Sequence, residues 1–320
     1  MMIERQQRTD ASLYSLVEDF FRNTFTTDNP LITEAIKRML QAGGKRLRPR
    51  ITLLAAEANG GAAEEHLHLA AYMELIHVAT LIHDDVVDNA QTRRGVNATA
   101  VDYGNRISVL AGDYLFAWIF KNVTAQYPHP VPNILSATLA DICDGEVLQL
   151  RALGNLELAL AAYVEIVMKK TASLFAASAE CGAIMGAGQP LHVKALRDYG
   201  MYYGIAFQML DDLLDMTADA QSLGKPVGND LAERKITIPL ILALARADGD
   251  TRALVERFYS GDEGCRTAQV IAAIERCGGL HGTREHIAHY AHRAKLSLAP
   301  LENSAAKAEL GRLADALLAE

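Results

Sequence analysis

The sequence predicts an all-α protein, a bundle of helices around a deep central cavity. Apolar residues recur at helical spacing along almost the whole chain, alanine and leucine dominate, and the alternating patterns typical of strands are nearly absent. Several of the apolar runs are long enough to form helices that surround such a cavity.

The expected helices are separated by clear breaks. Gly43-Gly44 ends one helix, and Pro49 suits the first turn of the next. Glycine and proline also mark loops near 60–61, 128–132, 186–190 and 224–228. In order along the chain, we expect helices near 10–25, 30–42, 49–59, 63–90, 107–126, 132–153, 157–170, 172–187, 191–218, 235–247, 250–259, 264–277, 279–298 and 302–319.

Composition favours an ordinary globular protein. The chain has 320 residues, of which 50% are hydrophobic and 22% are charged, so a large core can form. No linker rich in proline, glycine or serine marks a boundary, and we expect one domain over residues 1–320. The formal net charge of -8 argues against a nucleic-acid-binding protein, which usually carries a basic surplus.

The chain also lacks targeting signals. Its first ten residues are charged and contain no apolar stretch of the signal-peptide kind. The longest apolar region, 67–82, is interrupted by His68, Glu74 and His77, so no membrane span is expected. The four cysteines are far apart and form no C-x-x-C pair, which is typical of a reducing compartment. We therefore expect a cytoplasmic protein.

Two aspartate clusters of identical spacing indicate the chemistry. They are Asp84, Asp85 and Asp88, and Asp211, Asp212 and Asp215. On a helix, positions i and i+4 share a face, so the outer two aspartates of each cluster should point the same way. Carboxylates that close repel one another and require cations. Their oxygens suit Mg²⁺, which commonly bridges protein carboxylates to substrate phosphates.

A single acidic cluster is usually a solvated helix face. Both clusters here are embedded in apolar sequence, with Leu81 and Ile82 beside the first and Met209 and Leu210 beside the second. We therefore interpret both as cavity walls, and two such faces opposed across a cavity would hold a metal-bound diphosphate.

Cations accompany the first cluster. The segment 43–49 combines a flexible turn, three cations and a helix N-terminus, whose N–H groups attract anions, although a solvated basic loop is the alternative. Arg93 and Arg94 follow the cluster by one loop, and arginine is the preferred bidentate partner of phosphate. His77 lies about 10 Å before Asp84 on the same helix face, with a neutral core histidine as the alternative.

Weaker signals lie near the second cluster. Gln208 precedes Asp212 by one turn, and the other polar candidates are Lys170, Thr171, Lys225 and Lys235. A further stripe of Glu285, His286, His289 and His292 completes no recognisable metal-ligand pattern, and we interpret it as part of a structural helix.

These motifs, in this order, resemble the trans-isoprenyl diphosphate synthases of the polyprenyl synthetase family, most of all the long-chain octaprenyl type. The resemblance covers about residues 31–242. Its motifs are GKRLRP at 44–49, HDDVVD at 83–88, RRG at 93–95, GD at 112–113, GEVLQL at 145–150, KTASLF at 170–175, FQMLDDLLD at 207–215 and LGKPVGNDL at 223–231. One residue departs from the pattern, because Arg234 stands where a glycine usually precedes the last lysine, Lys235.

The resemblance implies an isoprenoid-synthase fold, a homodimer, and the Mg²⁺-dependent condensation of isopentenyl diphosphate with an allylic diphosphate. Asp84, Asp88 and Asp211 would hold the metal, with Asp85, Asp212 and Asp215 in support. Arg93, Lys170, Lys225 and Lys235 would neutralise the allylic phosphates, and Lys45, Arg48, His77 and Arg94 would bind isopentenyl diphosphate. Thr171 and Gln208 would face the allylic cation or the allylic substrate.

The resemblance also bears on product length. In this family the residues four and five positions before the first aspartate narrow the tail pocket when they are bulky, and here they are the small Thr80 and Ala79. We expect an open tunnel, a product of about C40 for quinone side chains, and a peripheral membrane contact that could assist its release.

Other functions stay open from the sequence. A short-chain synthase that makes a C15 or C20 diphosphate is the alternative within the family. A noncatalytic partner subunit should lack site residues, and none is missing here. A metal-dependent phosphohydrolase that uses His83 and Asp84 leaves the second cluster unexplained.

Overall fold

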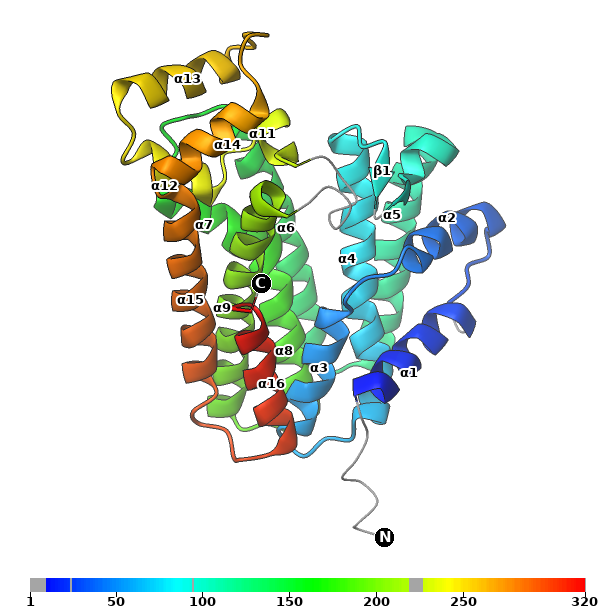
Figure 1. Cartoon of the computed structure of the whole chain (residues 1–320). Helices are drawn as coiled ribbons and strands as arrows, with labels where there is room; N and C mark the ends of the chain where they lie inside the picture. The colour runs from blue at the N-terminus through cyan, green and yellow to red at the C-terminus, as the bar shows by residue number, and fades with distance from the viewer. Residues whose placement is uncertain (1–9, 24, 94, 219–226, 320) are drawn as a thin grey trace. The chain divides into compact units, whose positions relative to one another are not determined.

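The computed structural model describes residues 10–23, 25–93, 95–218 and 227–319. Among these residues the secondary structure is helical apart from one short ribbon, which confirms the all-α prediction (Figure 1). The chain divides into two units. Unit 1 comprises Met1–Ser136, Ala177–Arg197 and Pro300–Ala308, and unit 2 comprises Ala137–Ala176, Asp198–Ala299 and Glu309–Glu320. The single domain over residues 1–320 stays a prediction.

Unit 1 is built on two long helices, α4 and α5, which run side by side (Figure 1). Its elements are α1 (Asp10–Asn23), α2 (Pro30–Gln41), α3 (Leu47–Glu57), the 3-10 turn η2 (Ala63–His66), α4 (Leu67–Val87), β1 (Thr92–Arg93), β2 (Val96–Asn97) and α5 (Thr99–Gln126). Gly112 permits the close approach, since a Cβ atom there would lie 2.2 Å from Nε2 of His83 on α4.

Unit 2 contains most of the remaining helices. They are α7 (Leu160–Val167), the π turn η3 (Met168–Ala172), α11 (Asn229–Ala232), α12 (Ile238–Leu244), α13 (Gly249–Tyr259), α14 (Thr267–Arg276) and α15 (Gly279–Ser297). Four further helices contribute residues to both units, namely α6 (Val131–Ala152), α8 (Ser173–Met185), α9 (Pro190–Thr217) and α16 (Ala305–Ala316).

Local sequence explains where some helices begin. Asn29 precedes α2, and its side-chain oxygen accepts hydrogen bonds from the backbone N–H groups of Leu31 and Ile32. Pro30 occupies the first helical position, where its missing N–H costs nothing. Asp248 caps α13 in the same way, by accepting a bond from the N–H of Thr251. Each cap satisfies N–H groups that have no partner within the helix.

Three details differ from the expected helices. A helix near 107–126 was expected, but α5 begins at Thr99 and continues through a kink at Gly104, whose φ of 78° and ψ of 157° are not helical. The ribbon of β1 and β2 was not expected, because strands of two residues are too short to show alternation. The expected helices 157–170 and 172–187 meet without a loop, through the π turn η3.

The π turn packs tightly against α6. A Cβ atom at Gly145 would lie 2.5 Å from the backbone nitrogen of Lys170, so glycine is required for this approach. π turns insert one residue into a helix and are frequent at functional sites. This one carries Lys170 and Thr171, two of the predicted site residues.

Over the described ranges, the structure has no helix whose length and apolar character would allow it to cross a bilayer.

Candidate active site

The first aspartate cluster lies at the C-terminal end of α4, in unit 1. Asp84 and Asp88 are partly accessible, whereas Asp85 between them is 0% exposed. The backbone N–H of Asp88 donates to the carbonyl of Asp84 at 2.8 Å, so the helical spacing persists to the end of the cluster. This is the arrangement expected when i and i+4 share an accessible face.

Arg93 holds the buried member of this cluster. Its Nε and Nη2 atoms lie 2.8 and 2.6 Å from Oδ1 of Asp85. Arg93 belongs to β1, so the ribbon that follows α4 is anchored to the helix by a charge-assisted contact. We predicted Arg93 as a phosphate partner, and here its guanidinium is about one-third exposed while it contacts Asp85.

Three further predicted residues lie on α4. His77 and Thr80 are partly accessible, and the Thr80 hydroxyl donates to the carbonyl of His77 at 2.8 Å. Ala79 has no accessible surface. His83 lies against α5, with its Nε2 atom 3.1 Å from the carbonyl oxygen of Val109.

The three cations of the basic loop 43–48 differ in their exposure to solvent. Lys45 is exposed, and Arg48 is mostly buried in the first turn of α3. Arg46 turns into the interior of unit 1, where it is 3% exposed and ion-paired with Glu18 and Glu74. The loop therefore offers Lys45 and Arg48 near a helix N-terminus, whereas the side chain of Arg46 points away from them into unit 1.

The second cluster lies on α9, in the part assigned to unit 2. Asp211 is exposed, whereas Asp212 and Asp215 are buried. Oδ2 of Asp215 accepts a bond from the backbone N–H of Asp230 at 3.1 Å, and the Asp215 carbonyl accepts one from Gly228 at 2.7 Å. The turn at 228–230 therefore covers Asp215, and Asp211 and Asp215 do not form the equally accessible pair that spacing alone predicted.

Asp212 is held by uncharged donors. The Tyr163 hydroxyl donates to its Oδ2 atom at 2.5 Å, and the Gln208 amide donates to its Oδ1 atom at 2.8 Å. Burial raises the pKa of Asp212 to about 7, against the lowering effect of these two bonds. Burial, followed by the charge of Asp212, also raises the pKa of Tyr163 well above its ordinary value, so its hydroxyl stays a donor.

The same chain of bonds reaches the π turn. The Thr171 hydroxyl donates to Oε1 of Gln208 at 2.9 Å, so Tyr163, Asp212, Gln208 and Thr171 form one hydrogen-bonded series. Because the Thr171 hydroxyl donates its hydrogen to Gln208, the lone pairs of its oxygen stay available as acceptors.

Lys170, the other predicted residue of the π turn, points toward α6. Its ammonium group donates to Oε1 of Gln149 at 2.6 Å and forms an ion pair with Glu146. Both partners belong to the motif at 145–150, so α6 determines where this cation lies.

The loop after the second cluster accommodates its unusual arginine. Arg234 adopts a left-handed φ of 62°, a conformation that glycine tolerates best. Its carbonyl accepts a bond from the N–H of Gly154 at 2.9 Å, which fixes the loop despite the side chain. Lys235 follows it and forms an ion pair of 2.6 Å with Glu233. Arg94 and Lys225 lie outside the described residues.

Sequence reasoning missed Tyr163, Gln149 and Glu146. Tyr163 lies in α7, directly before the π turn that carries Lys170. A buried tyrosine needs a partner for its hydroxyl, so a tyrosine in this apolar helix could have indicated a nearby polar group. The identity of that partner could not be derived, because Asp212 comes from a helix remote in sequence.

Magnesium fits the donor set. Asp84 and Asp88 are hard oxygen donors with accessible surface, and Mg²⁺ usually takes one or two carboxylates and completes its shell with water and substrate phosphate. Within the described ranges, no group of three or more His, Cys, Asp or Glu residues is placed to hold an ion.

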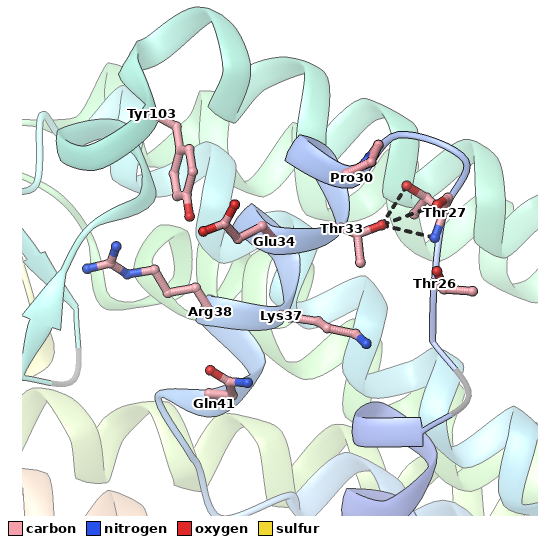
Figure 2. Close-up of a pocket in the computed structure, with 9 residues that line it drawn as sticks. All are labelled: Thr26, Thr27, Pro30, Thr33, Glu34, Lys37, Arg38, Gln41 and Tyr103. Atoms are coloured by element: carbon pink, nitrogen blue, oxygen red, sulfur yellow. Dashed lines mark hydrogen bonds between the residues drawn. The ribbon is translucent and has the colours of Figure 1, made fainter.

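A separate pocket of about 570 Å³ lies in unit 1 beside α2 (Figure 2). The residues that line it include Glu34, Lys37, Arg38, Gln41 and, from α5, Tyr103. Arg38 is ion-paired with Asp102. The residues that line this pocket include none of the predicted site residues.

Comparison with known proteins identifies the family. The polyprenyl synthetase family model matches residues 29–276. The chain is 39% identical to a short chain isoprenyl diphosphate synthase of Methanothermobacter thermautotrophicus over 292 residues, 90% of each protein. It is 37% identical to the octaprenyl diphosphate synthase of Escherichia coli, over 87% of this chain and 86% of that protein.

A solved structure agrees. The polyprenyl synthase of Caulobacter crescentus CB15, complexed with calcium and isoprenyl diphosphate, superposes with a TM-score of 0.89 and 38% identity, over 97% of this chain and 94% of that chain. The chain therefore belongs to the polyprenyl synthetase family and is a trans-prenyl diphosphate synthase, a prenyltransferase.

Proposed function

We propose that this enzyme elongates an allylic diphosphate with isopentenyl diphosphate units to an all-trans product of octaprenyl length, about C40, for quinone side chains. The observation that carries the length is the small Thr80, one turn before Asp84, because Ala79 beside it is fully buried. Thr80 keeps accessible surface on the face that also carries His77 and Asp84, and its short side chain is folded back onto the carbonyl of His77. At this position α4 therefore presents only the short side chain of Thr80 to a tail that passes along this face.

The proposed reaction breaks the C–O bond between the allylic carbon and its diphosphate. The double bond of isopentenyl diphosphate then attacks the allylic cation, a C–C bond forms, and a proton leaves to restore an allylic double bond. Negative charge builds on the departing diphosphate, and preorganised cations stabilise it. When bound, Mg²⁺ would supply most of that stabilisation.

The residues divide between the two substrates as the resemblance implies. Asp84, Asp85, Asp88, Asp211, Asp212 and Asp215 serve the metal-bound allylic diphosphate, with Arg93, Lys170, Lys225 and Lys235 as its cations. Lys45, Arg48, His77 and Arg94 bind isopentenyl diphosphate. The exposure of Lys45 and the partial exposure of His77 support this assignment.

Thr171 and Gln208 are suited to the cationic stage. The Thr171 hydroxyl donates to Gln208, so its oxygen presents lone pairs to its other side, and lone pairs stabilise a nearby carbocation or accept a proton. Water must be kept from that cation, and an apolar cavity does so.

A short-chain product is the second candidate, because the chain is as similar to a short-chain synthase as to an octaprenyl synthase. The product of the wild type, made from farnesyl diphosphate and labelled isopentenyl diphosphate, decides between them. Products near C40 support the proposal, and products that stop at C15 or C20 favour the short-chain function. Absence of any product would favour the noncatalytic partner subunit.

A variant sharpens that assay. Thr80→Phe places a ring on the accessible face of α4, so we expect its longest product to be shorter by several isoprene units. Ala79→Phe is the matched comparison. Ala79 is fully buried, and overpacking there should lower stability by about 1–3 kcal/mol. Unchanged product length in Thr80→Phe would contradict the proposed role of this turn.

We also propose a homodimer, on the strength of the family resemblance. Sedimentation equilibrium of the purified protein tests it, and a mass near one chain of 34.8 kDa would contradict it.

A further inference from the structure

Arg46 occupies an unusual position for a cation in a basic loop. It follows Lys45 directly and adopts the left-handed region, with φ 46° and ψ 38°. Residues other than glycine rarely adopt this conformation, and it persists where surrounding contacts over-determine it. Gly43, two residues before Lys45, has a φ of 79°, so the loop has little rigidity of its own. Contacts from outside the loop must therefore fix its conformation.

The guanidinium of Arg46 fastens the loop to three helices. Its Nε atom donates to Oε1 of Glu18 on α1 at 2.7 Å, and its Nη1 atom donates to Oε1 of Glu74 on α4 at 2.9 Å. Its Nη2 atom donates to the carbonyl of Leu40, in the last turn of α2, at 2.6 Å. The ring of Phe21 lies 5.2 Å from the guanidinium carbon.

Each nitrogen of this side chain therefore binds a different helix. The planar fork of arginine suits such a junction, and lysine, a compact charge on a flexible stem, cannot reach three acceptors in fixed directions. The side chain of Glu74 is as buried as that of Arg46, and Glu74 lies one turn before His77 on α4. The loop is thus fastened to the helix that carries another predicted ligand of isopentenyl diphosphate.

We propose that Arg46 is a positioning residue, which holds Lys45 and Arg48 in the geometry that binds isopentenyl diphosphate. Because Glu18 binds Arg46, helix α1 also helps to hold the loop, although α1 carries no predicted ligand. The inference rests on the proposed function, in which Lys45 and Arg48 bind this substrate.

A structural role alone would have a different signature. Buried ion pairs are weak evidence of stability, and breaking one lowers the stability of the whole fold. Loss of stability by itself would not distinguish the two substrates. Misplacement of Lys45 and Arg48 would weaken the binding of isopentenyl diphosphate and spare the allylic diphosphate.

Arg46→Lys tests this, because it keeps the charge and removes the fork. We expect KM for isopentenyl diphosphate to rise about tenfold, while KM for farnesyl diphosphate changes less than about twofold. Calorimetric titration of the same variant with isopentenyl diphosphate should show a matching loss of affinity. Arg38→Lys is the control for the same arginine-to-lysine change in unit 1, since the Arg38 side chain pairs with Asp102.

Glu18→Gln provides a second route if Arg46→Lys does not fold. Glu18 is less buried than Glu74, and its amide analogue keeps the shape but loses the charge. We expect a rise in the same KM of about threefold, in a protein with near wild-type melting temperature.

An unchanged KM for isopentenyl diphosphate in a folded variant, or an equal rise for both substrates, would overturn the inference. Failure of the proposed function looks different, because then the wild type itself would neither condense nor bind isopentenyl diphosphate, and the inference would fall with it.

Discussion

The two aspartate clusters share one spacing but hold their middle carboxylates in opposite ways. In unit 1, Asp85 meets the guanidinium of Arg93, a full charge 2.6 Å away. In unit 2, Asp212 meets the phenol of Tyr163 and the amide of Gln208, both uncharged. Spacing decides which carboxylates share a helix face, whereas residues from other elements decide the electrostatics of each. The middle carboxylate of the first cluster is charge-compensated, whereas burial raises the pKa of the middle carboxylate of the second, Asp212, to about 7.

The outer aspartates should matter most. Asp84→Ala removes an accessible carboxylate without emptying a core position, so we expect kcat to fall by at least about a thousandfold while the protein stays folded. Initial rates with labelled isopentenyl diphosphate measure the loss, and circular dichroism checks the fold. Retained activity would refute the metal assignment of the first cluster.

Disruption of the hydrogen-bonded series of Tyr163, Asp212, Gln208 and Thr171 should lower activity moderately. Tyr163→Phe deletes one hydroxyl and leaves Asp212 with the Gln208 donor alone, so the carboxylate that orients Gln208 loses one of its two fixed contacts. We expect kcat to fall about tenfold, with KM values little changed. Tyr199→Phe is the control, since Tyr199 is also buried and donates to the Leu310 carbonyl at 2.8 Å. Equal losses in both variants would mean that only core packing was disturbed.

The pH dependence of stability separates the two clusters further. The pKa of Asp212 is about 7 in the folded protein and about 4 when unfolded, so between these values the folded state binds more protons. The contribution of Asp212 to stability should therefore fall as pH rises from about 4 to 7, and Asp212→Asn should remove a pH-dependent term on the order of 2 kcal/mol. Denaturant unfolding of metal-free protein with EDTA at both pH values provides the measurement. A parallel pH profile in the variant would contradict the assignment.

The loops that follow the clusters differ as well, and the smallest effect is expected there. The first loop turns at Gly95, with φ 78°, whereas the second has Arg234 at φ 62°. Arg234→Gly should raise the free energy of unfolding by roughly 0.5–1 kcal/mol, because glycine adopts this conformation without strain. The same substitution removes the guanidinium that lies close to Gly154. Urea unfolding of the variant measures the balance, and a net destabilisation would show that this contact outweighs the strain.

Sequence alone predicted most of the helices because their apolar faces repeat with period 3.6. The helix at 30–42 is observed as Pro30–Gln41, and the one at 279–298 as Gly279–Ser297. What could not be predicted depends on contacts remote in sequence. The start of α5 at Thr99 lies beyond a glycine with non-helical angles, and the π turn has no composition of its own.

The same distinction between local pattern and remote contacts applies to the candidate site. Motif spacing alone indicated that Asp84 and Asp88 share an accessible face, and the structure agrees. It gave no sign that Arg46 turns inward to Glu18 and Glu74, because three adjacent cations look alike in a sequence. Nor could it show that Asp215 is covered, since the turn at 228–230 that covers it lies beyond the helix.

The most direct test of Mg²⁺-dependent condensation uses the wild-type protein and labelled isopentenyl diphosphate. Transfer of the label into an extractable prenyl product is measured with Mg²⁺ and with EDTA. We expect labelled product with Mg²⁺ and none with EDTA. Release of diphosphate or phosphate from either substrate with no new C–C bond would contradict it, and would make the aspartate clusters part of a hydrolase.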